Sequence, residues 1–407
     1  MSDKGRGIRG LTLFLAAAAG FSNANIYYNQ PLLGHMAHSY GEGANSISFI
    51  PAATQLGFSL GLVLLVPLGD TLDRRKLILW QTAGLVLALV AAALAPSPLL
   101  LMMASVVVGA SATIVQHIIP LAAELAPPEV RGRMVGTVMG GLLAGVLLAR
   151  TLSGLVGEHF GWRAMYFLGA GIAVAIGVML AVKLPRFKPE KTYSYKRLML
   201  SLVQLVRSYP QLRRAVVAQG ALFAGFSAFW ATLSLLLQGP PYHLGSDVAG
   251  LFGIIGLAGI LAAPLAGRIA DKRGPGSTRG LGALLTLAGF ALFAVYPTIP
   301  GLGLGVALMD AGVQTAMVSH QSVIFALEPG ARSRINTIYM TGLFLFGAFG
   351  SAAGSAAWNL AGWAGVAGLG LTLAAASFLL SLGWKARIRT GFPDNTASCS
   401  GQSVEKP

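Results

Sequence analysis

The sequence predicts an all-α membrane protein in which twelve transmembrane helices form two six-helix bundles, with the N- and C-termini in the cytoplasm. Three observations lead to this prediction: the composition, the recurrence of long apolar stretches and the placement of basic residues. Of the 407 residues, 55% are hydrophobic and only 11% are charged, whereas an ordinary soluble domain has roughly 25% charged residues. Composition alone therefore indicates a membrane protein.

Apolar stretches of about 18 to 24 residues recur along the chain, and each is long enough to cross a hydrocarbon core of roughly 30 Å as a helix. The tightest connection contains Pro96 and Pro98, which end the third helix and begin the fourth. The predicted spans are residues 11–32, 46–68, 77–95, 99–121, 134–157, 163–184, 215–237, 247–268, 280–297, 301–324, 336–357 and 363–384.

Basic residues gather in the loops that follow the even-numbered spans and at both ends of the chain. They include RRK at 74–76, after the second span, and a basic stretch at 183–214, after the sixth. The positive-inside rule places these loops and both termini in the cytoplasm. The net charge of +15 therefore reflects membrane topology, and we expect no nucleic-acid partner. Of the lysines and arginines, only Arg150 lies deep inside a predicted span.

A sequence repeat divides the chain into two halves. GDTLDRR at 69–75 is echoed by GRIADKRG at 267–274, and RGR at 131–133 by RSR at 332–334. Tandem halves of this kind place a binding site near the membrane midplane, between halves that rock about it. We predict four regions: an N-terminal six-helix bundle at 1–185, a cytoplasmic linker at 186–212, a C-terminal six-helix bundle at 213–389 and a disordered cytoplasmic tail at 390–407.

The repeated loop resembles the loop motif of the major facilitator superfamily, in which three residues separate a Gly from an Asp followed by basic residues. The first copy departs from the family pattern at Lys76, where a second Gly is usual. The glycines allow close helix approach, and the aspartates can cap helix termini or pair with arginines when the cytoplasmic side is closed. A merely solvated turn is the alternative. The matching residues are Gly69, Asp73 and Arg74 in the first copy and Gly267, Asp271, Lys272 and Gly274 in the second.

The fifth span is a second point of comparison with this superfamily. Its proton-coupled drug antiporters carry a Gly-Pro and later a Gly-Gly there, whereas this chain reads GLLAGVLLAR at 141–150, without the proline and with Arg150 in place of a Gly. This departure weakens the antiporter assignment. Small residues at 141, 145, 149 and 153 still predict a groove for close helix packing.

The linker contains an amphipathic segment from Lys196 to Ser208. One face carries apolar residues and the other basic ones with a glutamine, and Leu200 is the exception to this division. The apolar residues are Leu198, Leu202, Leu205 and Val206, and the polar ones are Lys196, Arg197, Gln204 and Arg207. We expect an interfacial helix that lies on anionic cytoplasmic headgroups and ends before Pro210. A regulatory partner could bind the same face.

The first span ends in an unusually polar stretch, NANIYYNQPLL at 23–33. On a continuous helix Asn23, Tyr27 and Gln30 share one face, while Asn25, Tyr28 and Asn29 share nearly the opposite one. Lipid cannot satisfy these groups, so we expect one face to line a watery cavity and the other to bond to neighbouring helices. We assign Asn25, Tyr28 and Asn29 to the cavity. The alternative is that all six groups only join helices together.

The resemblance implies that the first, fourth, seventh and tenth spans line the central cavity. An unpaired carboxylate near the middle of the membrane is costly, so its presence there suggests a function. Asp310 is therefore a candidate, with Gln314 one turn away on the same face. His117 and His320 could titrate near neutral pH, or they could be hydrogen-bonded packing residues. The remaining candidates for the cavity are Gln116, His117 and Trp230.

Arg150 and Asp310 lie at similar depths, about 10 Å and 14 Å from the outer ends of their spans at 1.5 Å per residue. We hypothesise that they interact across the two halves when the outer side is closed, and that protonation or substrate binding separates them. Burial and a neighbouring cation have opposite effects on the proton affinity of a carboxylate, so this contact could act as a proton-coupled gate. A permanent ion pair is the structural alternative.

The sequence predicts a secondary active transporter that moves a small organic solute by alternating access, with protons as the coupling ion. The stretch NIYYNQPLL at 25–33 resembles one in bacterial efflux-type members of the superfamily, which favours export of drugs or metabolites across the bacterial cytoplasmic membrane. A proton-coupled importer of an organic anion, with Arg150 as anion clamp, is the first alternative. A non-transporting membrane sensor or scaffold is the second.

No nucleophile triad, paired-acid site, phosphate loop or metal-ligand spacing is apparent in the sequence, so we expect neither an enzyme nor a cofactor nor a metal site. The expected partners are a small-molecule substrate, protons and the lipid bilayer. We expect the chain to act as a monomer.

Overall fold

The computed structural model describes residues 3–41, 44–184, 194–256 and 275–382, together with five single positions between 259 and 268. These residues form helices and the turns between them, and they contain no strand. Nine helices in the described part of the chain are long and apolar enough to cross a membrane. The all-α membrane fold is confirmed, while the count of twelve spans and the cytoplasmic termini stay predictions.

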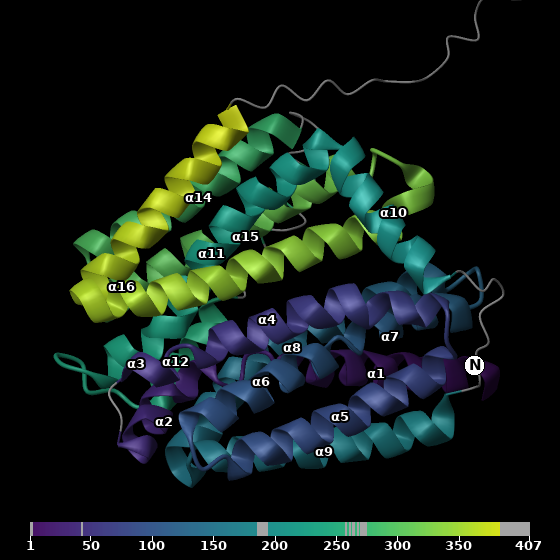
Figure 1. Ribbon diagram of the computed structural model, residues 1–407, viewed down its shortest axis with the longest axis horizontal. Coiled ribbons are helices and arrows are strands. Elements are labelled where there is room, and N and C mark those ends of the chain that lie inside the picture. The colour runs from purple at the N-terminus through teal and green to yellow at the C-terminus, as the bar shows by residue number, and fades with distance from the viewer. Residues whose placement is uncertain are drawn as a thin grey trace, which may run out of the picture.

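The N-terminal half is the lower layer in Figure 1, drawn in purple to blue. Its first span consists of a long helix, α1, followed by turns and the short element η1. The helices of this half are α1 (Asp3–Ala24), η1 (Gln30–Leu32), α2 (Leu33–Tyr40), α3 (Ala44–Ile47), α4 (Ile50–Leu64), η2 (Val66–Asp70), α5 (Arg74–Leu94), α6 (Pro98–Ala112), α7 (Val115–Leu125), α8 (Arg131–Phe160) and α9 (Trp162–Lys183).

The C-terminal half forms most of the upper layer, and α10 (Tyr195–Ser208) lies at one end of the molecule, alongside both layers (Figure 1). A kink at Ala361 and Gly362, where Gly362 has a φ of 57°, divides the last helix into the predicted eleventh and twelfth spans. The helices of this half are α11 (Pro210–Gln238), α12 (Ser246–Ile255), α14 (Pro275–Val295), α15 (Ile299–Ile324), η3 (Pro329–Ala331) and α16 (Arg332–Leu382).

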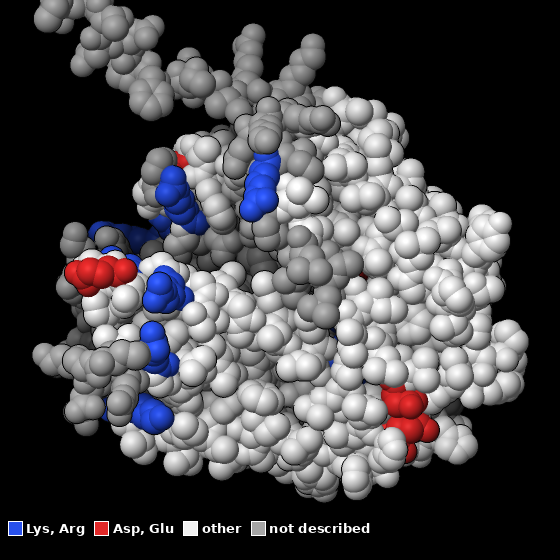
Figure 2. Space-filling view, turned by 180° about the vertical axis from the view of Figure 1, so that it is seen from behind, with Lys and Arg blue, Asp and Glu red and all other residues white. Residues whose placement is uncertain are grey.

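We call the end that carries α10 the cytoplasmic end and the opposite end the outer end, in keeping with the predicted topology. Figure 2 shows Lys and Arg gathered toward one end of the visible face, whereas acidic side chains lie both among them and toward the other end. Of the second loop motif, Gly267, Asp271, Lys272 and Gly274 lie outside the described residues.

Small residues bring α1 and α8 into close contact. A Cβ on Gly20 would lie 2.5 Å from the carbonyl oxygen of Gly141, and a Cβ on Gly141 would overlap the backbone of Ala16. Any larger residue at these positions would separate the two backbones. The packing groove predicted in the fifth span is therefore confirmed.

The first span is not the continuous helix assumed from the sequence. Helix α1 ends at Ala24, and turns with hydrogen bonds from Ile26 and Tyr27 to carbonyls three residues back lead into η1. The Asn25 side chain donates to the carbonyl oxygen of Phe21 at 2.6 Å and of Ser22 at 3.3 Å. Asparagine side chains compete in this way with the helical hydrogen bonds of the backbone. Pro31, inside η1, cannot donate a backbone hydrogen bond.

Candidate substrate site

A central cavity of about 190 Å³ lies between the two halves. Its walls are mainly aromatic and aliphatic, with a few polar groups. The N-terminal half contributes Asn23, Tyr27, Phe58, Gln116, Leu142, Leu143, Val146, Leu147 and Arg150. The C-terminal half contributes Phe223, Phe226, Gly256, Gly259, Asp310, Val313, Gln314, Met317, Met340, Leu343 and Phe344.

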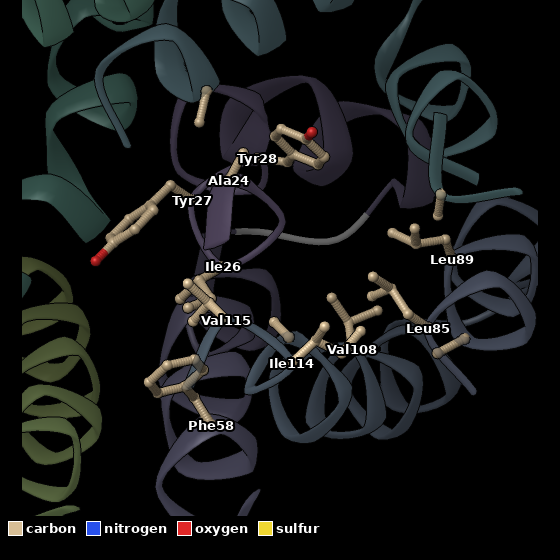
Figure 3. Packing of buried hydrophobic residues seen from close by; sticks show 14 of the residues in the cluster. Ala24, Ile26, Tyr27, Tyr28, Phe58, Leu85, Leu89, Val108, Ile114 and Val115 are labelled. Carbon is tan, nitrogen blue, oxygen red and sulfur yellow. The ribbon is translucent and has the colours of Figure 1, made fainter. Parts of the chain in front are cut away.

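The turn after α1 aims two neighbouring tyrosines in different directions. In Figure 3 the Tyr27 ring points away from the Tyr28 ring, and Tyr27 lines the central cavity. Tyr28 and Asn25 lie inside the N-terminal half, next to Gly169 of α9, where a Cβ would come within 3.2 Å of the Tyr28 ring and 3.5 Å of the Asn25 oxygen. The small residue on α9 thus leaves room for both side chains away from the cavity.

The assignment of Asn25, Tyr28 and Asn29 to the cavity lining is therefore corrected. The Asn29 amide donates to the Thr54 hydroxyl at 2.8 Å, within the N-terminal half. Asn23 and Tyr27, from the opposite predicted face, line the cavity in their place. The helical pattern distinguishes the two polar faces of this stretch. Which face lines the cavity depends on α8 and α9, which lie more than a hundred residues further along the chain.

Arg150 of α8 is only 2% exposed and is held by neutral neighbours. Its Nε donates to Gln30 Oε1 at 2.7 Å. Its guanidinium carbon lies 4.0 Å from the centre of the Trp230 ring and 4.7 Å from that of Tyr27, with Phe226 at 5.7 Å. Cation–π contacts of desolvated groups each contribute about 2 kcal/mol or more. Within the described chain, the Nη2 atom of Arg150 has no hydrogen-bond acceptor.

Asp310 of α15 is 7% exposed and faces the same cavity. Its Oδ2 lies beside Gly256, where a Cβ would come within 2.5 Å of it. Among the described residues, Oδ1 finds no hydrogen-bond donor. Trp230 lies near enough to interact with the carboxylate, but its Nε1 makes no hydrogen bond of good geometry in that part of the chain.

The direct contact expected between Arg150 and Asp310 is not formed. The described ion pairs do not include these two residues, so no Arg150 nitrogen lies within 4.0 Å of an Asp310 oxygen, although hydrogen bonds join α8 and α12 at the outer end. Gln30 and the aromatic rings surround the guanidinium instead. The two charges remain near enough to interact electrostatically.

The other predicted residues are distributed over two cavities. Gln314 lines the central cavity, one turn from Asp310, and Gln116 lines both the central cavity and a second one at the cytoplasmic end. His117 lines only the second. Trp230 is buried behind Arg150, which it contacts through its ring.

The cytoplasmic cavity has a volume of about 390 Å³ and is lined by both halves and by α10. Figure 2 shows a hollow near the basic side chains at this end. The lining residues are Val66, Pro67, Gly69, Asp70, Arg74, Gln116, His117, Pro120, Leu198, Leu202, Ser333, Arg334 and Thr337. Leu198 and Leu202 belong to the apolar face of α10, so at least part of this face lies against protein.

The first loop motif stabilises the N-terminal half at the cytoplasmic end. The Asp73 carboxylate accepts the backbone N–H of Arg75 at 2.9 Å and so caps α5. Arg74 donates to the Gly69 carbonyl at 3.1 Å, pairs with Asp70 at 3.5 Å and forms an ion pair with Glu124. All of these described partners belong to the N-terminal half.

At the outer end, by contrast, the two halves bond directly to each other. The Ser246 hydroxyl of α12 donates to the Gly154 carbonyl of α8 at 2.9 Å, and the Ser246 backbone N–H donates to Glu158 at 2.8 Å. Thr151 donates to the Gly250 carbonyl at 3.1 Å. We call these residues of α8 and α12 the outer contact.

Sequence reasoning missed the groups that surround Arg150. Gln30, Tyr27 and Phe226 contact its side chain, but they were not among the predicted site residues. The available signal was the shared face of Asn23, Tyr27 and Gln30, together with the rule that a buried guanidinium needs acceptors or aromatic rings.

Comparison with known proteins agrees with this architecture. The sequence profile described as Major Facilitator Superfamily matches residues 12–327. The chain is 36% identical to the transporter YgaY of Escherichia coli O157:H7 over 371 residues, which cover 91% of this chain and 94% of YgaY. It is 33% identical to the probable transporter SCO4007 of Streptomyces coelicolor, over 95% and 89% of the two chains.

Among solved structures, the nucleoside transporter NupG has a similar fold. Its TM-score is 0.71 at 15% sequence identity, and the alignment covers 91% of this chain and 98% of NupG. The fold, the profile match and the two relatives agree with one another. The chain therefore belongs to the Major Facilitator Superfamily and is a multi-pass membrane transporter, not an enzyme.

Proposed function

We propose that this protein is a proton-coupled secondary transporter that exports amphipathic drugs or metabolites across the bacterial cytoplasmic membrane. The observation that carries the proposal is Asp310, a carboxylate at 7% exposure that lines a cavity built by both halves and has a buried oxygen without a described hydrogen bond. A buried carboxylate that only stabilised the fold would have its partners satisfied.

Asp310 offers a simple means of coupling. The uncompensated carboxylate is stabilised either by a proton or by a cationic group of a solute, and the two compete for the same oxygens. Exchange of one for the other, in a cavity that opens alternately to each side, moves protons and solute in opposite directions. Since one chain supplies both walls of the cavity, a monomer suffices.

The lining of the cavity supports an amphipathic solute. Aromatic and aliphatic side chains form most of the wall, while Asn23, Gln116 and Gln314 add hydrogen-bonding groups. Such a mixture is typical of sites for organic molecules. Export as the direction rests on the resemblance of residues 25–33 to efflux-type members of the superfamily.

A second candidate is import of an organic anion with protons. The observation that favours it is the Nη2 of Arg150, which has no described acceptor and could bind a carboxylate of the solute. A transport-inactive sensor is the candidate from another class. A sensor has no need for unsatisfied charges in a cavity shared by both halves, so Arg150 and Asp310 argue against this candidate.

The experiment measures accumulation of a broad labelled panel of drugs and metabolites in cells that express wild type, Asp310→Asn or no transporter, with and without a protonophore. We expect wild type alone to lower the accumulation of some compounds, and the protonophore to abolish the difference. The control is Glu129→Gln, which makes the same carboxylate-to-amide change at an exposed loop position and should behave as wild type.

Higher accumulation with wild type would favour the importer. Protonophore-sensitive export that persists in Asp310→Asn would contradict the role of this carboxylate. No difference for any compound with well-expressed protein would favour the sensor.

A further inference from the structure

We infer that the central cavity binds a zwitterion: a solute with an apolar or aromatic body that carries a carboxylate, held by Arg150, and an ammonium group, held by Asp310. This inference rests on the proposed function and specifies its substrate class.

The first argument is the balance of charge in the cavity. Among its described lining residues, Arg150 and Asp310 are the charged ones. Each is more than nine-tenths buried, and each has a side-chain atom without a hydrogen-bond partner in the described chain, Nη2 and Oδ1 respectively. An anion would compensate Arg150 but not Asp310, and a cation the reverse. A zwitterion compensates both.

The second argument is the spacing of the two charges, which α12 determines. A Cβ on Gly253 would lie 3.1 Å from Arg150 Cβ and 3.6 Å from its Cδ, whereas a Cβ on Gly256 would lie 2.5 Å from Asp310 Oδ2. Positions three apart on a helix have Cβ atoms about 5–6 Å from each other. The two glycines therefore bring the arginine stem and the carboxylate to neighbouring turns of α12.

This spacing suits a bridged pair better than a direct one. The two residues do not pair directly. A charge-assisted hydrogen bond takes roughly 2.8 Å at each end, so a solute that bridges the two residues needs a carboxylate and an ammonium group a few bonds apart. Both groups of an amino-acid-like solute could thus be bound at once, one by each half of the protein.

The third argument is the wall around the charges. Trp230 and Tyr27 stack on the guanidinium and hold it by its faces, so that an edge remains available for an acceptor. Phe58, Phe223 and Phe344 line the cavity and provide an apolar surface for the body of the solute. A small, fully polar solute would leave this surface against water.

The test compares four forms of one molecule: phenylalanine, its methyl ester, N-acetylphenylalanine and the N-acetyl methyl ester. In the assay, at pH 6, they are respectively zwitterionic, predominantly cationic, anionic and neutral. Binding to the purified full chain in detergent is measured by thermal unfolding over a concentration series and repeated with the matching leucine and tryptophan compounds. In at least one series we expect the zwitterion to bind about tenfold more tightly than each other form, because each missing charge costs a charge-assisted hydrogen bond.

Two variants test separately whether Asp310 recognises the ammonium group and whether Arg150 recognises the carboxylate. Asp310→Asn should abolish the advantage of phenylalanine over N-acetylphenylalanine, and Arg150→Gln should abolish its advantage over the methyl ester. The matched controls are Glu129→Gln and Arg133→Gln, two exposed positions, which should keep the full preference. The ranking of the four forms by wild type is decisive even if a variant fails to fold.

The inference is overturned if a singly charged form binds as tightly as the zwitterion in all three series, or if no form binds. Such a result leaves the transport proposal intact when cells still export other compounds in a protonophore-sensitive manner. Conversely, zwitterion binding without any proton-dependent flux would contradict the proposed function and retain the site.

Discussion

The outer and cytoplasmic ends of the molecule differ in how the two halves meet. At the outer end, small side chains and backbone groups of α8 and α12 bond across the halves, as with Ser246 and Gly154 at 2.9 Å. At the cytoplasmic end a cavity of about 390 Å³ separates them, and the described bonds of Arg74 remain within one half. Direct hydrogen bonds of α8 and α12 thus join the halves at the outer end, whereas the described partners of Arg74 at the cytoplasmic end do not cross between them.

This difference indicates which contacts between the halves must break or form during transport. Alternating access requires the outer contact to break and the cytoplasmic ends to approach. A contact built from a few hydrogen bonds and small residues can break at modest cost, since a neutral bond contributes about 1 kcal/mol net and a bond to a charged group such as Glu158 about 1.5–3 kcal/mol. Arg150 is well placed to respond, because it lies one turn from Gly154 on α8 and faces the central cavity.

Of the three substitutions considered, Gly154→Leu should open the outer contact the most. A Cβ at this position would overlap the Ser246 carbonyl oxygen and lie 3.0 Å from the Gly250 Cα, so a leucine must push α8 and α12 apart. We expect about a tenfold faster reaction of Leu147→Cys, a cavity position, with a membrane-impermeant thiol reagent added outside, which corresponds to a shift of about 1.4 kcal/mol. Cys399, the single native cysteine, is replaced by serine in all variants.

The control for this change is Gly140→Leu on the same helix, where a Cβ would meet nothing within 4 Å. Equal labelling of the two leucine variants would mean that α8 and α12 do not close the outer end.

Glu158→Gln should have an intermediate effect. The Glu158 carboxylate accepts the Ser246 backbone N–H at 2.8 Å and the Ser246 hydroxyl at 3.2 Å, and it lies 3.3 Å from His35. An amide keeps one acceptor but loses the charge, so we expect about threefold faster labelling at Leu147→Cys, since hydrogen bonds to charged groups are stronger than neutral ones. The neighbouring exposed His159, whose described ring bond is to its own helix, provides the control His159→Gln. Unchanged labelling in Glu158→Gln would remove this residue from the outer contact.

Arg74→Gln should have the smallest effect on the same assay. Its carboxylate and carbonyl partners all belong to the N-terminal half, and exposed ion pairs contribute little. We expect labelling from outside to stay within about twofold of wild type. A change as large as that of Gly154→Leu would mean that the cytoplasmic loop motif supports the outer closure across the whole molecule.

The sequence predicted the two charged residues of the site because charge inside apolar spans is costly and therefore conspicuous. Arg150 and Asp310 do line one cavity, from opposite halves. The helical fold and the glycine groove on α8 also follow from local patterns of composition and small residues.

The residues around the site could not be assigned in the same way. Whether Tyr27 or Tyr28 faces the cavity depends on Gly169, which makes room for Tyr28 in the N-terminal half. The end of α1 at Ala24 depends on the side-chain bonds of Asn25. Arg150 and Asp310 pack against Gly253 of α12 and Gly256 just after its end, where a Cβ would meet each side chain. The contacts with Gly169, Gly253 and Gly256 are tertiary and no local pattern specifies them, whereas the Asn25 bonds are local and were not anticipated.

The most direct test of the central claim, that Asp310 couples protons to solute movement, is flux in proteoliposomes with and without an imposed pH gradient. The solute is a compound that the accumulation panel identifies. The account predicts that wild type concentrates it against its gradient when protons flow the other way. It predicts that Asp310→Asn still exchanges labelled for unlabelled solute but no longer responds to the pH gradient. An Asp310→Asn protein that responds to the gradient as wild type does would contradict the account.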